Sequence, residues 1–472
     1  MMSKEGRRRS SEDDRISGLP DELLHDILIR LRCARAAACT SVLSRRWRHV
    51  WADMPELTTA SFVNSVDAAL AAHAAPTLDR LLIALSDSAI SANAIPAARA
   101  VPWLRFAAER VAGALLLLVP PRPSSLLPVT LQELELPKCA RAKTVTLKLQ
   151  DTWLLRPADA AAGGVGVFTA LTTLTILYGR MDGGELSALV YTRRCPCLRD
   201  LKLRLTLLDD AARFSVPKLS ELVWTGDYAD DSHQFVNVSR SLQLLDIAPD
   251  RRSTVALTSL LQKFDEVDEL RLIIHISRVR SYQQNLLKTN RISYDPVGTA
   301  GYESFLNETS KLPKCKTLYI NLERNGHGLA PSMFHLLRNC TGAKKVSVRL
   351  LDLAHDSQKY SCPLSCPCHL AESCRVNDIT VSSLEEVEIS NCTSSHEELE
   401  FVEVLSKCNA TRLKHLVIYY YKRKFQAPLR SKEICKKICS MYGSNVEVEF
   451  YVVGKGRCFN WREDLQHVST KC

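Results

Sequence analysis

A short phrase with three spaced apolar residues recurs along most of this 472-residue chain. Its two clearest copies, Leu131–Cys139 and Leu384–Cys392, read LQELELPKC and LEEVEISNC. Weaker copies keep only the apolar triplet, at Leu78/Leu81/Ile83, Leu171/Leu174/Ile176, Leu198/Leu201/Leu203, Leu219/Leu222/Trp224, Leu242/Leu245/Ile247, Val267/Leu270/Leu272, Cys315/Leu318/Ile320 and Leu413/Leu416/Ile418. Within the clearest copies apolar and polar residues alternate, which is the period of a short β-strand. The chain is therefore expected to place many short strands side by side.

The spacing of these phrases resembles that of the leucine-rich repeat, whose units are about 20–29 residues long. The central leucines of neighbouring copies, such as Leu201, Leu222, Leu245 and Leu270, lie 21 to 25 positions apart. Segments with helical spacing fall between phrases, at Ser65–Ala75, Glu185–Tyr191, Ser332–Leu337 and Glu397–Leu405. A strand and a helix per repeat bury a continuous core when repeats stack. We predict an α/β fold with an irregular leucine-rich-repeat solenoid.

The repeat pattern is interrupted in two places. Residues Ile276–Glu303 are polar with little apolar period, which predicts a loop on the rim of the solenoid, either a recognition element or a tolerated insertion. The segment TLLDDAARFSVP before Lys218 leaves little room for a helix. The solenoid is therefore expected to be shortened or strained there.

The N-terminal segment Asp14–Leu57 has a different texture. Gly18–Glu22 places a proline at the start of a helix and two carboxylates in its first turn, where they favour the helix dipole. Leu23, Leu24, Ile27, Leu28 and Leu31 then follow at helical spacing. A second amphipathic turn, SVLSRRWR, closes the segment. About forty residues cannot bury this apolar surface on themselves, so the rest of the chain or a partner must cover part of it.

This segment resembles an F-box, in particular the plant form that ends in LSRRWRHVW. The resemblance implies docking on a Skp-type adaptor, which links the chain to the cullin scaffold and RING subunit of a ubiquitin ligase. It implies these adaptor contacts: Leu19, Pro20, Leu23, Leu24, Ile27, Leu28, Leu31, Val42, Leu43 and Trp47. The alternative is that the same residues form the core of an intramolecular helical hairpin.

The region from Ser382 onward resembles the FBD region that follows leucine-rich repeats in many plant F-box proteins. The pattern of this region predicts two more strand–helix units that cap the open end of the solenoid. The alternative is that the region forms a separate binding site. The expected domain boundaries are a disordered tail over 1–13, a three-helix F-box over 14–57, the solenoid over 58–380, the FBD-like cap over 381–455 and a tail over 456–472.

The 17 cysteines are scattered, odd in number and not preceded by a secretory leader, which favours the reducing cytosol or nucleus. One cluster is a weak candidate for a metal: Cys362, Cys366, Cys368, His369 and Cys374. Its spacing is not that of a standard zinc finger or RING, so we predict no metal site. No cofactor is expected either, although the sequence leaves open a small-molecule co-ligand in the solenoid.

No catalytic motif is complete. Gly163–Gly166 lacks the lysine of a phosphate loop, and the pair His396-Glu397 lacks the second histidine of a zincin. The net charge of +10 and basic clusters such as Lys422–Lys437 suggest nucleic-acid binding as a hypothesis. The basic clusters contain no recognisable recognition helix. GALLLLVPP, from Gly113, is too short to cross a bilayer.

The sequence therefore predicts a non-catalytic protein, the substrate-recognition subunit of an SCF-type (Skp–cullin–F-box) ubiquitin ligase, cytoplasmic or nuclear, with an unidentified target protein on its repeats. The alternative is a leucine-rich-repeat interaction scaffold without a ligase, whose F-box-like helices cap the first repeat. Nucleic-acid binding ranks third, and no membrane partner is expected.

Overall fold

The computed structural model describes two compact units, Met1–Val216 and Pro217–Cys472. The described residues are 18–86, 95–121, 130–158, 168–204, 207–208, 211–226, 233–249, 260–276, 299–340, 342–351, 362–370, 381–393, 395–408, 410–421, 428–442, 445–454 and 457–460. The predicted N-terminal tail lies outside them. Among the described helices, none combines the length and the apolarity that a membrane crossing requires.

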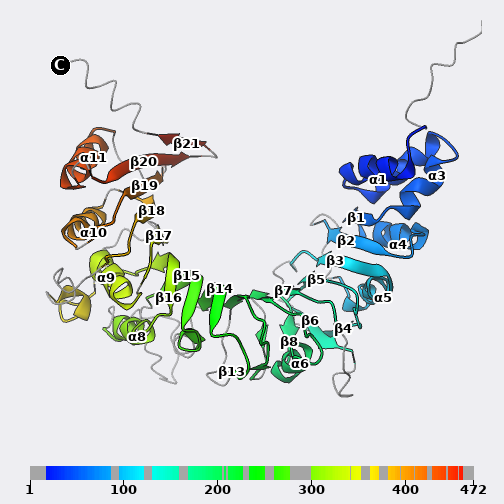
Figure 1. Ribbon diagram of the computed structural model, residues 1–472, viewed down its shortest axis with the longest axis horizontal. Helices are drawn as coiled ribbons and strands as arrows, with labels where there is room; N and C mark the ends of the chain where they lie inside the picture. The colour runs from blue at the N-terminus through cyan, green and yellow to red at the C-terminus, as the bar shows by residue number, and fades with distance from the viewer. Residues whose placement is uncertain are drawn as a thin grey trace, which may run out of the picture. The chain divides into compact units, whose positions relative to one another are not determined.

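The first unit opens with a group of short helices (Figure 1). They are α1 (Asp21–Arg30), α2 (Ala34–Cys39), η1 (Thr40–Val42), α3 (Trp47–Val50) and η2 (Trp51–Asp53). Pro20 precedes α1 as its N-cap, with extended backbone, and its carbonyl accepts the first helical hydrogen bond from Leu24 N–H. Asp21 and Glu22 occupy the first turn, as predicted. The three predicted helices are therefore present.

A parallel sheet follows these helices. Its strands, in spatial order, are β1 (Glu56–Ser61), β2 (Leu78–Leu85), β3 (Val111–Leu118), β5 (Thr144–Lys148), β7 (Thr173–Leu177) and β9 (Asp200–Arg204). The connecting segments contain α4 (Val63–Ala72), η4 (Ala97–Arg99), α5 (Val101–Arg110) and α6 (Gly183–Leu189). Helices α4 and α5 lie along one side of the strands (Figure 1). The helices predicted near Ser65–Ala75 and Glu185–Tyr191 are confirmed.

Equivalent apolar residues of neighbouring strands lie opposite one another in this sheet. The register aligns Leu57, Leu81, Leu115, Val145, Leu174 and Leu201. All six side chains are buried. Each strand thus buries its central apolar residue against the equivalent residue of the next strand, which is why the phrase recurs in the sequence.

One of the two clearest phrases does not join this sheet, contrary to the simple repeat prediction. Leu131–Cys139 contains β4 (Gln132–Leu136), which belongs to a four-stranded sheet with β6 (Trp153–Pro157), β8 (Arg180–Met181) and β10 (Leu207–Leu208). The place next to β3 is taken by β5, whose Val145 aligns with Leu115. Alternation predicts a strand but does not determine which sheet the strand enters, and that explains the difference.

The second unit contains its own run of parallel strands. They are β12 (Glu221–Gly226), β14 (Ser241–Pro249), β15 (Glu266–His275), β16 (Lys314–Glu323), β17 (Lys345–Leu350), β18 (Glu386–Cys392), β19 (His415–Tyr421) and β20 (Glu447–Gly454). Their register aligns Leu222, Leu245, Leu270, Leu318, Val346, Val387, Leu416 and Val448, all buried. The short strand β11 (Arg213–Phe214), at the end of the first unit, and the short strand β13 (Gln234–Phe235), in the second, lie outside these ladders.

Helices follow most of the later strands of this unit. They are α8 (Ala300–Glu308), α9 (Leu329–Asn339), η6 (Pro367–His369), α10 (His396–Lys407) and α11 (Pro428–Tyr442). In Figure 1, α8 to α11 succeed one another in chain order along one side of the strands. Helix α8 begins inside the predicted insertion Ile276–Glu303, of which residues 277–298 lie outside the described part of the chain. The predicted helices in α9 and α10 are confirmed.

The C-terminal region differs from the prediction at its last strand. Helix α10 starts with a capping box in which Ser395 Oγ accepts from Glu398 N–H and the Glu398 carboxylate accepts from Ser395 N–H. Beyond β20, the strand β21 (Arg457–Asn460) pairs with it antiparallel. The tail predicted over 456–472 thus contains a strand. So short a strand has too few residues to show a period in the sequence.

The close approach of β3 to β2 gives a testable prediction. A Cβ atom added at Gly113 would lie 2.1 Å from the Asp79 carbonyl oxygen, beside a register shift in the β2–β3 pair. Because backbone atoms cannot move aside easily, Gly113→Ala should destabilise the protein by about 1–3 kcal/mol. The measurement is the midpoint of thermal and urea unfolding.

Gly184 provides the matched control, since its added Cβ would meet only the Asp182 carboxylate oxygen, at 3.0 Å. Gly184→Ala should therefore cost much less. Equal losses for the two variants would contradict the packing of β3 on β2.

Candidate functional site

The F-box-like helices have an apolar core of their own. Leu24 and Leu28 of α1 are fully buried and pack with Ala37, Trp47 and Val50. Met54 completes this core. These side chains hold α1 against the two helices that follow it, so the segment is a folded module with its own interior.

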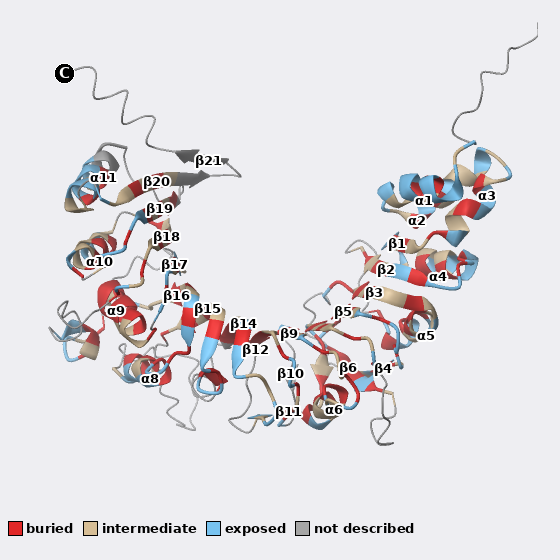
Figure 2. Ribbon diagram, viewed as in Figure 1, coloured by how far each residue is buried: buried red, intermediate tan, exposed pale blue. Residues whose placement is uncertain are grey.

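A second set of apolar side chains on the same module faces solvent. Leu23, Ile27 and Leu31 are exposed by 47%, 42% and 44%, and their spacing of four residues places them on one face of α1. Val42 and Leu43, on and after η1, are 86% and 64% exposed. Figure 2 shows buried and exposed residues side by side along α1. We call Leu23, Ile27, Leu31, Val42 and Leu43 the exposed apolar set.

This burial divides the predicted adaptor contacts. Leu24, Leu28 and Trp47 are buried in the module core, whereas five of the other predicted contacts form the exposed apolar set; contact with an adaptor stays a prediction. Pro20 is exposed, and Leu19 is partly buried against the core. The apolar pattern in the sequence does not separate the two faces of this helix. Adjacent residues such as Leu23 and Leu24 both fit the pattern, but their side chains point about 100° apart around the helix axis.

Polar contacts fix the arrangement of the helices. Arg46 forms an exposed ion pair with Asp21 in the first turn of α1, with its Nε 2.9 Å from Asp21 Oδ1. His25 Nε2 lies 3.0 Å from the Val50 carbonyl oxygen. Both contacts join α1 to the α3 region, 25 residues away in sequence. These contacts, together with the core, hold in place the helices that carry the exposed apolar set.

The solvent side of the second unit's strands carries charged and aromatic residues. Arg271 lies over the Tyr319 ring on the neighbouring strand, 5.3 Å from its centroid. Lys345 Nζ lies 2.7 Å from Glu386 Oε1. The rings of Tyr419 and Tyr451 stack at 5.1 Å between centroids. Partly exposed aromatic rings and arginine side chains are enriched at protein-binding surfaces, whereas lysine–glutamate pairs are not.

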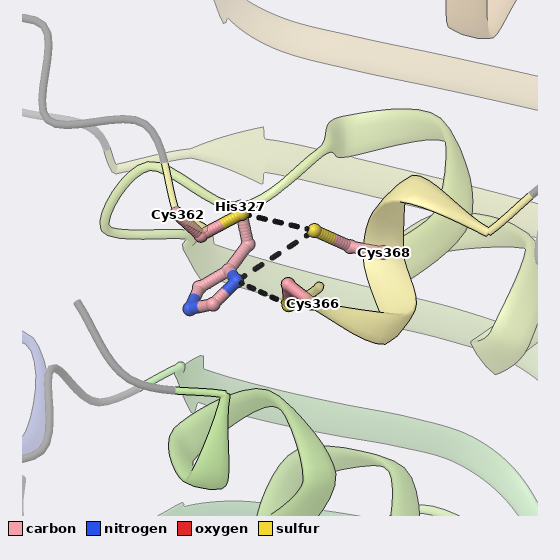
Figure 3. A group of neighbouring side chains, drawn as sticks. All are labelled: His327, Cys362, Cys366 and Cys368. Carbon is pink, nitrogen blue, oxygen red and sulfur yellow. Dashed lines mark hydrogen bonds between the residues drawn. The ribbon is translucent and has the colours of Figure 1, made fainter. Parts of the chain in front are cut away.

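The weak metal candidate also corresponds to a real cluster. His327, Cys362, Cys366 and Cys368 have ligand atoms that all lie within 4.8 Å of one another, and all four residues are buried. Figure 3 shows His327 Nδ1 facing Cys366 and Cys368. His327 was not predicted, because it lies 35 residues before Cys362. Exposed His369 is not one of the four, and Cys374 lies outside the described residues.

Burial sets the protonation of this cluster in the metal-free chain. It lowers the pKa of His327 to about 4, so the imidazole is neutral at pH 7. It raises the pKa of Cys368 to about 11, and those of Cys362 and Cys366 are also raised. The three thiols are therefore neutral in the absence of a nearby cation.

Comparison with known proteins bears on the N-terminal module. Residues 16–59 match the F-box domain family. The F-box/LRR-repeat protein 25 of Arabidopsis thaliana is 55% identical over 51 residues, which are 11% of this chain and 19% of that protein. The matched residues of the domain include α1 to η2 and most of β1.

Longer but weaker similarities extend over more of the chain. A protein of A. thaliana named as a probable FBD-associated F-box protein is 28% identical over 212 residues, covering 43% of this chain and 47% of the relative. An F-box/FBD/LRR-repeat protein of the same plant is 32% identical over 117 residues, covering 23% and 25%. The chain thus spans about half the length, or less, of these relatives.

The division of α1 into two faces gives a second testable prediction. Leu24→Ala should destabilise the module by roughly 2–5 kcal/mol, because it leaves a cavity in a closed core. Leu23→Ala, on the next residue, should change stability by no more than about 0.5 kcal/mol. Hydrogen exchange of the α1 amides checks both variants in the full chain, and faster exchange in Leu23→Ala alone would contradict the assignment of faces.

Proposed function

We propose that this chain, which carries an F-box domain and is related to plant FBD-associated and leucine-rich-repeat F-box proteins, is the substrate-recognition subunit of an SCF-type ubiquitin ligase. The F-box docks on a Skp-type adaptor and the repeats bind a target protein. The observation that carries the proposal is the exposed apolar set on an F-box whose core is already complete.

A partner that buries the exposed apolar set would gain binding free energy from the hydrophobic effect. Burying a leucine or isoleucine side chain that is now in water contributes roughly 1.5–3 kcal/mol when burial is complete. Leu23, Ile27 and Leu31 are each only about half exposed, so each contributes a fraction of that value. Together with Val42 and Leu43, which are more exposed, they are sufficient to anchor a stable helix-on-helix contact.

The repeats supply the second half of the function. We propose that the parallel strands and their helices form a leucine-rich-repeat solenoid in which the FBD-like region caps the C-terminal end. The aligned buried leucines support this, because each repeat completes the core of its neighbour. The charged and aromatic side of the strands, including Arg271, Tyr319 and Tyr419, is the surface for the target.

The chain itself performs no chemistry in this proposal. A target held on the repeats is kept near the ubiquitin carrier that the cullin and RING subunits hold, which raises its effective concentration. The rate of ubiquitin transfer then depends on how long the target stays bound and on where its lysines lie. The cytoplasm or the nucleus is the proposed compartment.

The proposal is tested by adaptor binding. The triple variant Leu23→Ala, Ile27→Ala, Leu31→Ala should weaken binding of a purified Skp-type adaptor to the full chain by about a hundredfold or more, because about 1 kcal/mol is lost at each of the three truncated contacts. Titration calorimetry measures the Kd, and the circular dichroism spectrum should not change.

Leu131→Ala is the control, since Leu131 is 46% exposed but lies outside the F-box. It should bind the adaptor as the unmodified chain does. If the folded unmodified chain does not bind the adaptor, the ligase proposal is wrong, and an interaction scaffold without a ligase takes its place.

A further inference from the structure

We propose that His327, Cys362, Cys366 and Cys368 bind one zinc ion. Three thiolates and one imidazole are a common ligand set for structural zinc. Among the described residues, these four form the one group of three or more metal-type ligands that lie within reach of a single ion. The F-box match, over residues 16–59, does not include this cluster.

The ligand atoms lie near the spacing of a tetrahedral site. Zinc bonds of about 2.3 Å to sulfur and 2.0–2.1 Å to nitrogen place the ligand atoms about 3.5–3.8 Å from one another. His327 Nδ1 lies 3.5 Å from Cys366 Sγ and 3.8 Å from Cys368 Sγ. Cys362 Sγ lies 3.1 Å from Cys368 Sγ, longer than a disulfide bond and shorter than the zinc geometry. All four ligand atoms lie within 4.8 Å of one another, so side-chain movements of about 1 Å or less would complete the site.

Two connections between secondary-structure elements bring the four ligands together. His327 lies in the turn between β16 and α9, after Asn325 and Gly326, both with positive φ. The three cysteines come from the connection between β17 and β18, where η6 includes Cys368. Cys362 N–H donates to the Gly326 carbonyl oxygen, which ties this connection to the histidine turn. Two segments distant in sequence thus meet at the four ligands.

One further polar group lies beside the sulfur atoms. Exposed His369 has its Nε2 3.0 Å from Cys362 Sγ. A hydrogen bond from an imidazole N–H to a metal-bound thiolate stabilises it by spreading its negative charge.

The imidazole is oriented for coordination through Nδ1. Its ring stacks on Tyr302 of α8, with 5.1 Å between centroids and 29° between planes. His327 is fully buried, and its Nε2 has no hydrogen-bond partner in the described part of the chain. Coordination through Nδ1 places the ring proton on Nε2, so the zinc bond must outweigh the cost of burying that N–H without a partner.

The consequence for the protein is structural. Residues 352–361 and 371–380, on either side of the cysteines, carry few large apolar side chains in the sequence. A zinc ion would fix the β17–β18 connection to the turn before α9 at one point. Zinc binding then stabilises the second unit without taking part in adaptor docking.

The first test is metal content. The full chain, produced with zinc in the medium, should contain one zinc per chain by elemental mass spectrometry. Replacing zinc with Co²⁺ should give the visible absorption of a tetrahedral site together with sulfur-to-cobalt charge-transfer bands. His327→Ala and Cys366→Ser should lose the metal, whereas Cys139→Ser, at a buried cysteine outside the cluster, should keep it.

A second variant separates lost binding from lost folding. His327→Cys keeps four ligands and should retain one metal per chain with stronger charge-transfer bands, because four thiolates replace three. Three results would overturn the proposal: metal-free chains with Cys362 and Cys368 joined in a disulfide, metal-free chains with all three thiols open to alkylation, or full zinc content in His327→Ala with Cys366→Ser combined. Adaptor binding, measured in parallel, should not depend on zinc, so this proposal and the ligase proposal can fail independently.

Discussion

The arrangement of this protein depends on the burial of equivalent apolar side chains across parallel strands. In the second unit Leu245, Leu270 and Leu318 lie in register on three successive strands, and none is accessible to water. No strand of this kind could bury its own leucine alone, so each one is stable only beside its neighbours. Insertions between strands are tolerated as long as this contact is kept, as the long segment between β15 and β16 demonstrates.

The F-box obeys a different constraint. Its few helices close a small core around Leu24, Leu28 and Trp47, and the same helices leave Leu23, Ile27 and Leu31 in water. A module of this size has too little interior for both sets. The apolar residues it leaves outside are what a partner can bury, so the size limit of the module and its proposed docking function have one physical origin.

The cysteine and histidine cluster shows how a repeat fold can bring distant chemistry together. Cys362, Cys366 and Cys368 follow β17, and His327 follows β16. Because β16 and β17 are parallel neighbours, the segments that leave their carboxyl ends start at the same edge of the sheet. A site can therefore form between neighbouring connections although the local sequence marks only its cysteines and not His327.

The sequence by itself determined the strand phrases, the helices between them and the F-box segment, because these depend on local periodicity and on a contiguous motif. Leu384–Cys392 and Glu397–Leu405 became β18 and α10 for this reason. Only the tertiary structure decided what depends on contacts between distant segments. It placed Leu131–Cys139 in a second sheet, divided Leu23 from Leu24, and brought His327 to the cysteines. Periodicity indicates which side chains of an element are apolar, but packing decides which of them are buried and which neighbour covers them.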